Sequence, residues 1–358
     1  KLLNDDVGDL WDSGKVMSDE SSQVSYQGKP LVSRQQCYWK VRAWDQSGKA
    51  GAWSSIEQWQ MGLLTPADWQ AQWISAVPPA GNTNDTNDTL IIRRATYEAV
   101  EGNRVADVTT MLASQVKQNH LKLEVNNKTL GVDPAFNVVK RLRVQYEYAG
   151  KTFEKEIDEN QTLALPESDG ALPYLRKSFQ LKAPVQRAIL YATALGLYDA
   201  HINGKRVGDH VLAPDWTDYR KRVRYQAYDV TALLKPGGNA LAVLLADGWF
   251  SGHIGNGGYE FFGKTPAFLA QLEVTYADGR TERIVTDDSW KCHASPVLFS
   301  DFMLGEDYDS RLEIKGWDQP GLNESSWAAV ALRDESSRKL ESQVMEPVRE
   351  QVELKPKK

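Results

Sequence analysis

The chain has 358 residues, of which 41% are hydrophobic and 25% charged, so its composition excludes wholesale disorder and collagen-like structure. Its 42 Lys and Arg residues against 48 Asp and Glu residues leave a formal net charge of −6, which argues against a nucleic-acid-binding protein. No stretch approaches the roughly 18 continuous apolar residues of a membrane span. The length predicts about two or three domains.

The two cysteines, Cys37 and Cys292, allow at most one disulfide and cannot form a zinc site by themselves. The chain begins at Lys1 with no apolar signal core, so we expect a sequence trimmed at its front. Twelve Trp and fourteen Tyr residues offer aromatic faces of the kind that stack on sugar rings, although large β cores also use such residues.

The first region of the chain has a strand pattern. Residues 36–44 alternate, with Cys37, Trp39 and Val41 on one face, which predicts a half-buried strand. A turn is expected at 45–48. We interpret this region as a short β-sandwich whose first strands are missing.

A polar, low-complexity loop at 81–89 separates this region from a second one with strand patterns. There Leu121 and Leu123 alternate with polar residues, and Leu142 and Val144 do the same. We expect a small inserted β module.

The third region has the clearest strand signals. Tyr198, Ala200 and Ile202 share one face of a strand that ends at Asn203-Gly204, a dipeptide favoured in tight hairpin turns.

Further strands are expected downstream in this region. Val223, Tyr225 and Ala227 are expected on one face of a second strand, and the apolar run 240–246 predicts a strand buried on both faces. Many short strands with no long helical periodicity predict a jelly-roll or sandwich.

Few residues in the sequence form a recognisable catalytic motif. The five histidines are scattered, with neither an H-E-x-x-H motif nor a cysteine partner at metal spacing, and His201 is expected to be solvated. The absence of G-x-S-x-G gives serine hydrolysis no support. The glycine-rich segment 252–258 lacks a closing Gly-Lys-Ser/Thr, so we interpret it as a surface loop.

Two acidic residues, Glu306 and Asp307, raise the question of glycosidase chemistry, which uses a pair of carboxylates. Neighbours in a strand point to opposite faces, so a structural role is favoured for them. The step Asp247-Gly248-Trp249 is the best ligand candidate, because it places a carboxylate and an indole at a strand end. The alternative is that Trp249 plugs the mouth of the sandwich.

Several ordered segments of the chain resemble the amino-terminal β domain of bacterial α-L-rhamnosidases. They include 195–198, 202–209, 212–219, 228–231, 247–252, 266–272, 305–311 and 316–318. Upstream, residues 38–45 with Gly48, Trp53 and Ser54 resemble the fibronectin-III-like domain that precedes it in these enzymes.

The resemblance implies an inverting glycoside hydrolase that removes terminal α-L-rhamnose. Such enzymes use two carboxylic acids, which lie on an (α/α)6 barrel after another β-sandwich. The chain stops about where that sandwich would start, so we predict the non-catalytic amino-terminal part of such an enzyme, inactive alone and without a catalytic residue. Its partners would be a rhamnose-containing glycan and the missing catalytic domain, and its place the periplasm or the cell exterior.

Some relatives bind L-rhamnose on this jelly-roll with a calcium ion. This chain carries Tyr259-Glu260-Phe261-Phe262-Gly263 where the resemblance implies an Asn-bearing loop. No metal ligand is assigned, no cofactor is required, and calcium is an open expectation. The candidate sugar contacts are Asp247, Trp249, Asp215 and Trp216.

We therefore predict an all-β fold of tandem β-sandwich domains. The expected boundaries are a fibronectin-III-like sandwich at 1–66, a linker at 67–89, an inserted β module at 90–166, a jelly-roll of the galactose-binding-like type at 167–335 and a linker at 336–358. Two alternatives stay open for the function: a stand-alone glycan-binding module, or a structural spacer. A charged tail at 350–358 without a strand pattern favours a cut linker.

Overall fold

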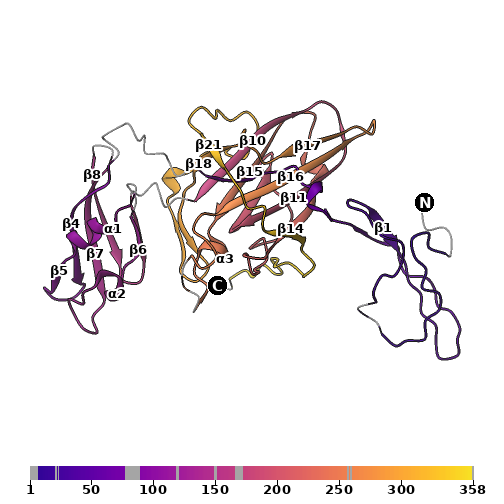
Figure 1. Cartoon of the computed structure of the whole chain (residues 1–358), viewed down its shortest axis with the longest axis horizontal. Coiled ribbons are helices and arrows are strands. Elements are labelled where there is room, and N and C mark those ends of the chain that lie inside the picture. The colour runs from indigo at the N-terminus through magenta and orange to yellow at the C-terminus, as the bar shows by residue number, and fades with distance from the viewer. Residues whose placement is uncertain are drawn as a thin grey trace. The chain divides into compact units, whose positions relative to one another are not determined.

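The computed structural model describes residues 7–20, 22, 24–76, 89–117, 121–148, 151–165, 172–255, 258 and 260–356 (Figure 1). Strands dominate it, which confirms the all-β class, and the longest helix in these ranges, α1 (Thr109–Gln115), has seven residues. The chain divides into two compact units, Lys1–Gln70 with Leu340–Ser342, and Ala71–Lys339 with Gln343–Lys358.

The first unit contains one short antiparallel pair of strands. Its elements are β1 (Gln36–Trp39), β2 (Glu57–Gln60) and the 3-10 turn η1 (Pro66–Asp68). Cys37 is buried, but Trp39 and Val41 are exposed, so the prediction of a half-buried strand through 44 is wrong beyond the fourth residue. The cations of Lys40 and Arg42 lie 4.6 and 4.4 Å from the ring centroid of Trp53. Lys40 and Arg42, on the face that alternates with Trp39 and Val41, therefore pack on an aromatic ring.

The region of the predicted inserted module has its own hydrophobic core. Its elements are β4 (Ile91–Ala99), β5 (Val105–Asp107), α1, β6 (Leu121–Glu124), α2 (Asn127–Leu130), β7 (Lys140–Tyr148), β8 (Lys151–Asp158) and β9 (Thr162–Leu165). One sheet has the order β5-β4-β7-β8, and β6 pairs with β9. Leu121, Leu142 and Val144 are buried, as their alternation predicted. The sequence analysis missed β4 and α1.

The sandwich of the second unit is formed by the remaining strands. Its elements are β3 (Trp73–Ala76), β10 (Pro173–Leu181), β11 (Val185–Leu195), β12 (Leu197–Ile202), β13 (Lys205–Arg206), β14 (Arg222–Asp229), η3 (Thr231–Leu233), β15 (Gly237–Ala246), α3 (Gly248–Ser251), β16 (Ala267–Tyr276), β17 (Thr281–Val285), β18 (Lys291–Ala294), β19 (Val297–Asp301), β20 (Gly305–Tyr308), η5 (Ser310–Leu312) and β21 (Ala328–Arg333).

Most of these strands form a curled sheet in the order β13-β12-β15-β10-β18-β21-β3-β16-β11-β14, with β17 paired to β16 (Figure 1). Strands β19 and β20 form a separate two-stranded sheet. One core cluster contains apolar side chains from both halves of the sheet, such as Leu241 and Val243 from β15 and Leu190 and Leu272 from β11 and β16. At about 25 cal/mol per Å² of apolar surface buried, this shared core is the main stabilising contribution of the sandwich.

Two details of the strands match the sequence analysis. Tyr198, Ala200 and Ile202 are buried on one face of β12. Asn203 and Gly204 adopt φ angles of 53° and 82° in the turn to β13. This left-handed backbone is what the dipeptide predicted.

Strand β14 differs from its prediction. Val223 and Tyr225 are buried, but Ala227 is exposed, whereas Gln226 and Tyr228 are buried. The polar Gln226 is tolerated inside because its amide is hydrogen bonded on both sides, to Tyr198 at 2.7 Å and Gln343 at 2.8 Å. Alternation alone could not reveal those partners.

The first predicted linker needs correction, because part of it belongs to the sandwich. Strand β3 pairs with β21 through four residues and with β16 through Ile74, which is fully buried. The sandwich therefore begins near residue 71, before the region 90–166, and not at 167. Most of the polar loop at 81–89 lies outside the described residues.

The second predicted linker, 336–358, also needs correction. Backbone hydrogen bonds join Gln343 to Tyr225 and Val211 to Val348, each at 2.9 Å. Arg349 donates to Asp209 at 2.8 Å. Residues 343–349 are therefore hydrogen bonded to the sandwich.

Candidate ligand-binding surface

The structure brings together two of the four candidate contacts, Trp216 and Trp249. Their indole rings stack with centroids 5.4 Å apart and an interplanar angle of 15°. Trp216 is 56% exposed, and Trp249 is half-buried. The exposed indole of Trp216 therefore offers a ring face on which a ligand ring can lie.

Local backbone geometry explains how Trp249 reaches this position. Strand β15 ends at Ala246, and the short helix α3 begins at Gly248 with a φ of +51°. A Cβ atom on Gly248 would lie 2.5 Å from Leu197 Cγ and 2.9 Å from Leu197 N. Only glycine fits there, and the sharp change of direction presents the next residue, Trp249, to Trp216.

A third aromatic residue, Phe302, completes the surface. It follows β19, is 48% exposed, and its ring centroid lies 3.9 Å from that of Trp249. We call Trp216, Trp249 and Phe302 the aromatic ledge. The sequence analysis missed Phe302, because the two segments approach each other only in the fold.

The two candidate aspartates are directed into the protein. Asp247 is 7% exposed, and one of its carboxylate oxygens lies 3.7 Å from Lys122 Nζ. Asp215 Oδ1 accepts a hydrogen bond of 2.9 Å from Gln343 Nε2. Burial raises the pKa of the Asp215 carboxyl, because a low-dielectric environment disfavours its charged form.

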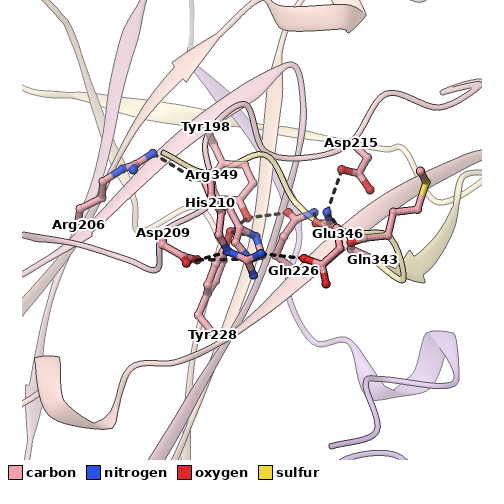
Figure 2. A network of polar contacts seen from close by, with 11 residues as sticks. Tyr198, Arg206, Asp209, His210, Asp215, Gln226, Tyr228, Gln343, Glu346 and Arg349 are labelled. Carbon is pink, nitrogen blue, oxygen red and sulfur yellow. Dashed lines mark hydrogen bonds and ion pairs between the residues drawn. The ribbon is translucent and has the colours of Figure 1, made fainter. Parts of the chain in front are cut away.

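Asp215 belongs to a polar network beneath the tail, shown in Figure 2. Gln343 connects Asp215 to Gln226, and Gln226 accepts from the hydroxyl of Tyr198. Tyr198 and Tyr228 follow, with hydroxyl oxygens 3.1 Å apart. The network therefore links the residue next to the ledge with the segment 343–349.

Buried polar atoms without a partner gather near the ledge. Four side-chain atoms in the described ranges are buried and have no hydrogen-bond partner: Arg42 Nε, Asp215 Oδ2, Tyr219 OH and Ser251 Oγ. The last three lie on the two segments that carry the ledge tryptophans. The rings of Tyr219 and Phe250 also meet edge to face at 5.6 Å, which joins these segments below the surface. Such atoms are rare in folded proteins and mark a place where water or a ligand group is to be expected.

A histidine–aspartate pair borders the ledge. Asp301, the residue before Phe302, has a fully buried side chain, and its Oδ2 lies 3.0 Å from His253 Nδ1. His253 follows α3 by two residues. The sequence analysis placed His253 only in a surface loop, because its carboxylate partner is distant in the chain.

Other candidate chemistry has structural explanations. His201 is not solvated as predicted, since its Nδ1 lies 2.8 Å from Asp318 and its ring lies 5.0 Å from that of Trp317. Glu306 and Asp307 are neighbours in β20, so they point to opposite faces of the strand. Within the described ranges, no group of three or more His, Cys, Asp or Glu side chains is arranged to hold a metal ion.

The sequence also resembles known proteins. Residues 183–352 match the family model of the alpha-L-rhamnosidase N-terminal domain, and residues 2–65 match that of the Rha78A-like, N-terminal immunoglobulin domain. Immunoglobulin and fibronectin-III-like domains are both β-sandwiches. Residues 76–166 match a model described as DnaJ-like protein C11, C-terminal.

Among curated relatives, an alpha-L-rhamnosidase of Streptomyces avermitilis is 36% identical over 98% of this chain and 42% of its own length. One of Alteromonas sp. is 32% identical over 90% of this chain and 27% of its own length. The chain thus spans less than half of the length of these relatives.

Two solved structures are similar to this chain. The alpha-L-rhamnosidase of Streptomyces avermitilis complexed with L-rhamnose has a TM-score of 0.67, with 32% identity, and the match covers 95% of this chain and 41% of that one. The alpha-L-rhamnosidase from Dictyoglumus thermophilum has a TM-score of 0.65 with 29% identity, covering 97% of this chain and 30% of that one. No helix within the described ranges is long and apolar enough to cross a membrane.

Proposed function

Because this chain carries the α-L-rhamnosidase N-terminal domain over residues 183–352, we propose that it is the non-catalytic amino-terminal part of an enzyme that hydrolyses terminal α-L-rhamnose from glycosides or polysaccharides. The observation that carries the proposal is the alignment of nearly the whole chain with less than half of a relative of that name. We assign no catalytic residue to this chain.

Within this enzyme, the aromatic ledge is proposed to contact the rhamnose-containing glycan. A pyranose ring has an apolar C–H face that can lie on the stacked indoles of Trp216 and Trp249, while its hydroxyl groups point outward. Asp247 and Asp215 would act indirectly, since Asp247 is buried and Asp215 is already hydrogen bonded to Gln343. The rest of the enzyme, including its catalytic domain, is the second proposed partner.

The structure gives less support to calcium binding than to glycan binding. The described acidic side chains do not assemble into a group that could hold a metal ion, and Asp247 and Asp215 have Lys122 and Gln343 as neighbours. No step of the proposed function depends on calcium, and titration with and without a chelator tests it. A periplasmic or extracellular location is proposed from the glycan-degrading activity alone.

The proposal is tested on the chain and on its natural parent. The purified chain should not hydrolyse an aryl α-L-rhamnoside, and turnover well above a buffer blank would overturn the non-catalytic assignment. Antibodies against this chain should recover from its source cells a longer polypeptide that hydrolyses the same rhamnoside. A recovered polypeptide without that activity would contradict the parent enzyme and favour the stand-alone glycan-binding module.

A further inference from the structure

We infer that residues 343–349, the tail segment, make a pH-dependent contact with the sandwich: the segment stays bound while the ring of His210 is neutral and is released when that ring takes up a proton. This device acts on the sandwich itself and is independent of the proposed glycan-binding role. The position of His210 between two contacts of the tail segment carries the inference.

His210 lies between two residues that hold the tail segment. Asp209 accepts a hydrogen bond of 2.8 Å from Arg349 Nε, and the backbone N–H of Val211 donates to the carbonyl of Val348 at 2.9 Å (Figure 2). The residues that make these two contacts are the direct chain neighbours of His210. A charge on its imidazole is therefore close to both of them.

The ring of His210 is mostly buried among groups that stay uncharged. Its side chain is 19% exposed, and its Nδ1 lies 3.4 Å from the hydroxyl of Tyr228, whose ring centroid is 5.2 Å away. Burial raises the pKa of Tyr228 to about 12, and it raises the pKa of Tyr198, the next hydroxyl in the network, well above the ordinary value. Of these three side chains, the imidazole is the one that titrates near neutral pH.

Charged groups from several parts of the chain face this ring. Burial disfavours the charged imidazole, as do the guanidinium groups of Arg349 on the tail segment and Arg206 on β13. The carboxylates of Asp209 and Asp215 favour the charged form, but they do not prevail, and the pKa of His210 lies below its ordinary value. While the tail segment is bound, the ring therefore resists protonation.

Release of the tail segment changes these influences in one direction. The ring gains water, the guanidinium of Arg349 moves away, and Asp209 loses the cation that it binds. Glu346, the other partner of Arg349, is 91% exposed, so solvent screens its charge. The released state consequently takes up a proton more readily than the bound state, and a fall in pH through about 6.5 shifts the equilibrium toward release.

Asp215 titrates in the opposite sense. Its carboxylate accepts from Gln343 of the tail segment at 2.9 Å, and burial raises its pKa. Release exposes this carboxyl to water and moves its pKa back toward about 3.9, so a proton on Asp215 favours the bound state. The ordinary pKa values of the two groups differ by about 2.6, so His210 dominates between about pH 7.5 and 5.5.

Hydrogen exchange at the backbone amides of Gln343 and Val211 tests the inference in the whole chain, because both amides donate across the contact, to Tyr225 and Val348. A free imidazole changes from about one-tenth to about nine-tenths protonated between pH 7.5 and 5.5. Protection of the two amides, corrected for the intrinsic effect of pH on exchange, should therefore fall by up to about 10-fold. Backbone amides of β15, in the core of the sandwich, should keep their protection.

The variants separate His210 from other titrating groups. His210→Gln removes the titrating ring and should abolish the fall in protection, whereas Asp215→Asn should retain it. His293→Gln is the matched control and should behave as the unsubstituted chain does, because that ring lies 2.9 Å from the carbonyl oxygen of Ala294 and packs near Trp327. The same fall in His210→Gln, or an equal loss of protection in β15, would overturn the inference.

A second measurement applies if His210→Gln does not hold the tail segment at any pH. NMR titration of the His210 imidazole in the unsubstituted chain should give a pKa below the ordinary value. Arg349→Gln removes the cation of the tail segment from beside the ring and should raise that pKa. An unchanged pKa in Arg349→Gln would show that the ring and the tail segment are not coupled, which would also overturn the inference.

Discussion

Gln343 donates a hydrogen bond of 2.9 Å to Asp215, so a residue of the segment first predicted to be a linker binds the residue next to Trp216. Gln343 also accepts from Gln226 at 2.8 Å. The tail is thereby part of the sandwich, and its position is coupled to the segment that carries the ledge.

Removing this connection should release the tail. Gln343→Ala leaves the carboxylate of Asp215 and the amide of Gln226 without this partner, which should lower the free energy of unfolding by about 1–3 kcal/mol. Hydrogen exchange across 343–349 should accelerate. Val344→Ala is the control, since that side chain is 78% exposed. Unchanged exchange in Gln343→Ala would show that the tail is held by other contacts.

A second prediction concerns Arg176, whose side chain is completely buried. It donates to Glu324 at 2.7 Å and to the backbone carbonyls of Trp317 and Gln319 at 2.8 and 2.7 Å. Arg176→Met removes the guanidinium donor from all three acceptors and should lower the free energy of unfolding by about 3–5 kcal/mol, measured by urea denaturation.

The control for Arg176 is Arg311, which is paired with Asp309 but lies at the surface. Arg311→Met should cost at most about 1 kcal/mol, because solvent screens exposed ion pairs. Equal losses in the two variants would contradict the role given to the buried guanidinium.

Two histidines should give opposite dependences of stability on pH. Burial lowers the pKa of His210, so the unfolded chain takes up a proton first as pH falls through about 6.5. Burial also opposes charging of His201, but hydrogen bonds to Asp199 and Asp318 outweigh it and raise its pKa. His201 therefore contributes stability that is present below about pH 6.5 and is lost as pH rises through its folded pKa.

The pH prediction is tested by comparing the free energy of unfolding of the unsubstituted chain with that of each histidine variant. Between pH 7.5 and 5.5, about one unit either side of the unperturbed histidine pKa, the stability advantage of the unsubstituted chain over His210→Gln should shrink. Its advantage over His201→Gln should grow. Denaturant titrations across this interval measure both, and parallel slopes would refute the assignment of the two rings.

The backbone under the ledge gives a further prediction. Gly248→Ala adds a Cβ that collides with Leu197, in addition to the strain of a positive φ. Gly279 also has a positive φ, of +83°, but nothing lies within 4 Å of its would-be Cβ. Gly248→Ala should therefore be about 1–3 kcal/mol more destabilising than Gly279→Ala. Equal losses of stability in the two variants would mean that Leu197 leaves room for a Cβ atom at position 248.

Strands with strict alternation and strong turn residues could be predicted from the sequence. Tyr198 to Gly204 is such a case, because its side-chain pattern and its turn are both local. The alternation of β14 failed at Gln226, whose burial depends on Gln343, more than a hundred residues later. A local pattern contains no information about such a partner.

In the candidate surface, too, some residues could be predicted from local sequence and others depend on contacts between distant segments. Trp249 and Trp216 stood out because each lies close to an aspartate at a predicted strand end. Phe302 and the pairing of His253 with Asp301 arise only when β19 and α3 meet in the fold. The aspartates Asp215 and Asp247 carried the right chemistry for a sugar site, but the fold directs both into the protein.

The most direct test of the account is a titration of the chain with L-rhamnose followed by tryptophan fluorescence, in calcium and in chelator, with Trp249→Ala alongside. The account predicts a saturable change in the unsubstituted chain that is lost in Trp249→Ala, and equal curves in the two media would exclude a need for calcium. A flat response up to millimolar L-rhamnose, a binding free energy weaker than about −4 kcal/mol, would contradict the ledge as a glycan-binding surface and leave these domains as a scaffold.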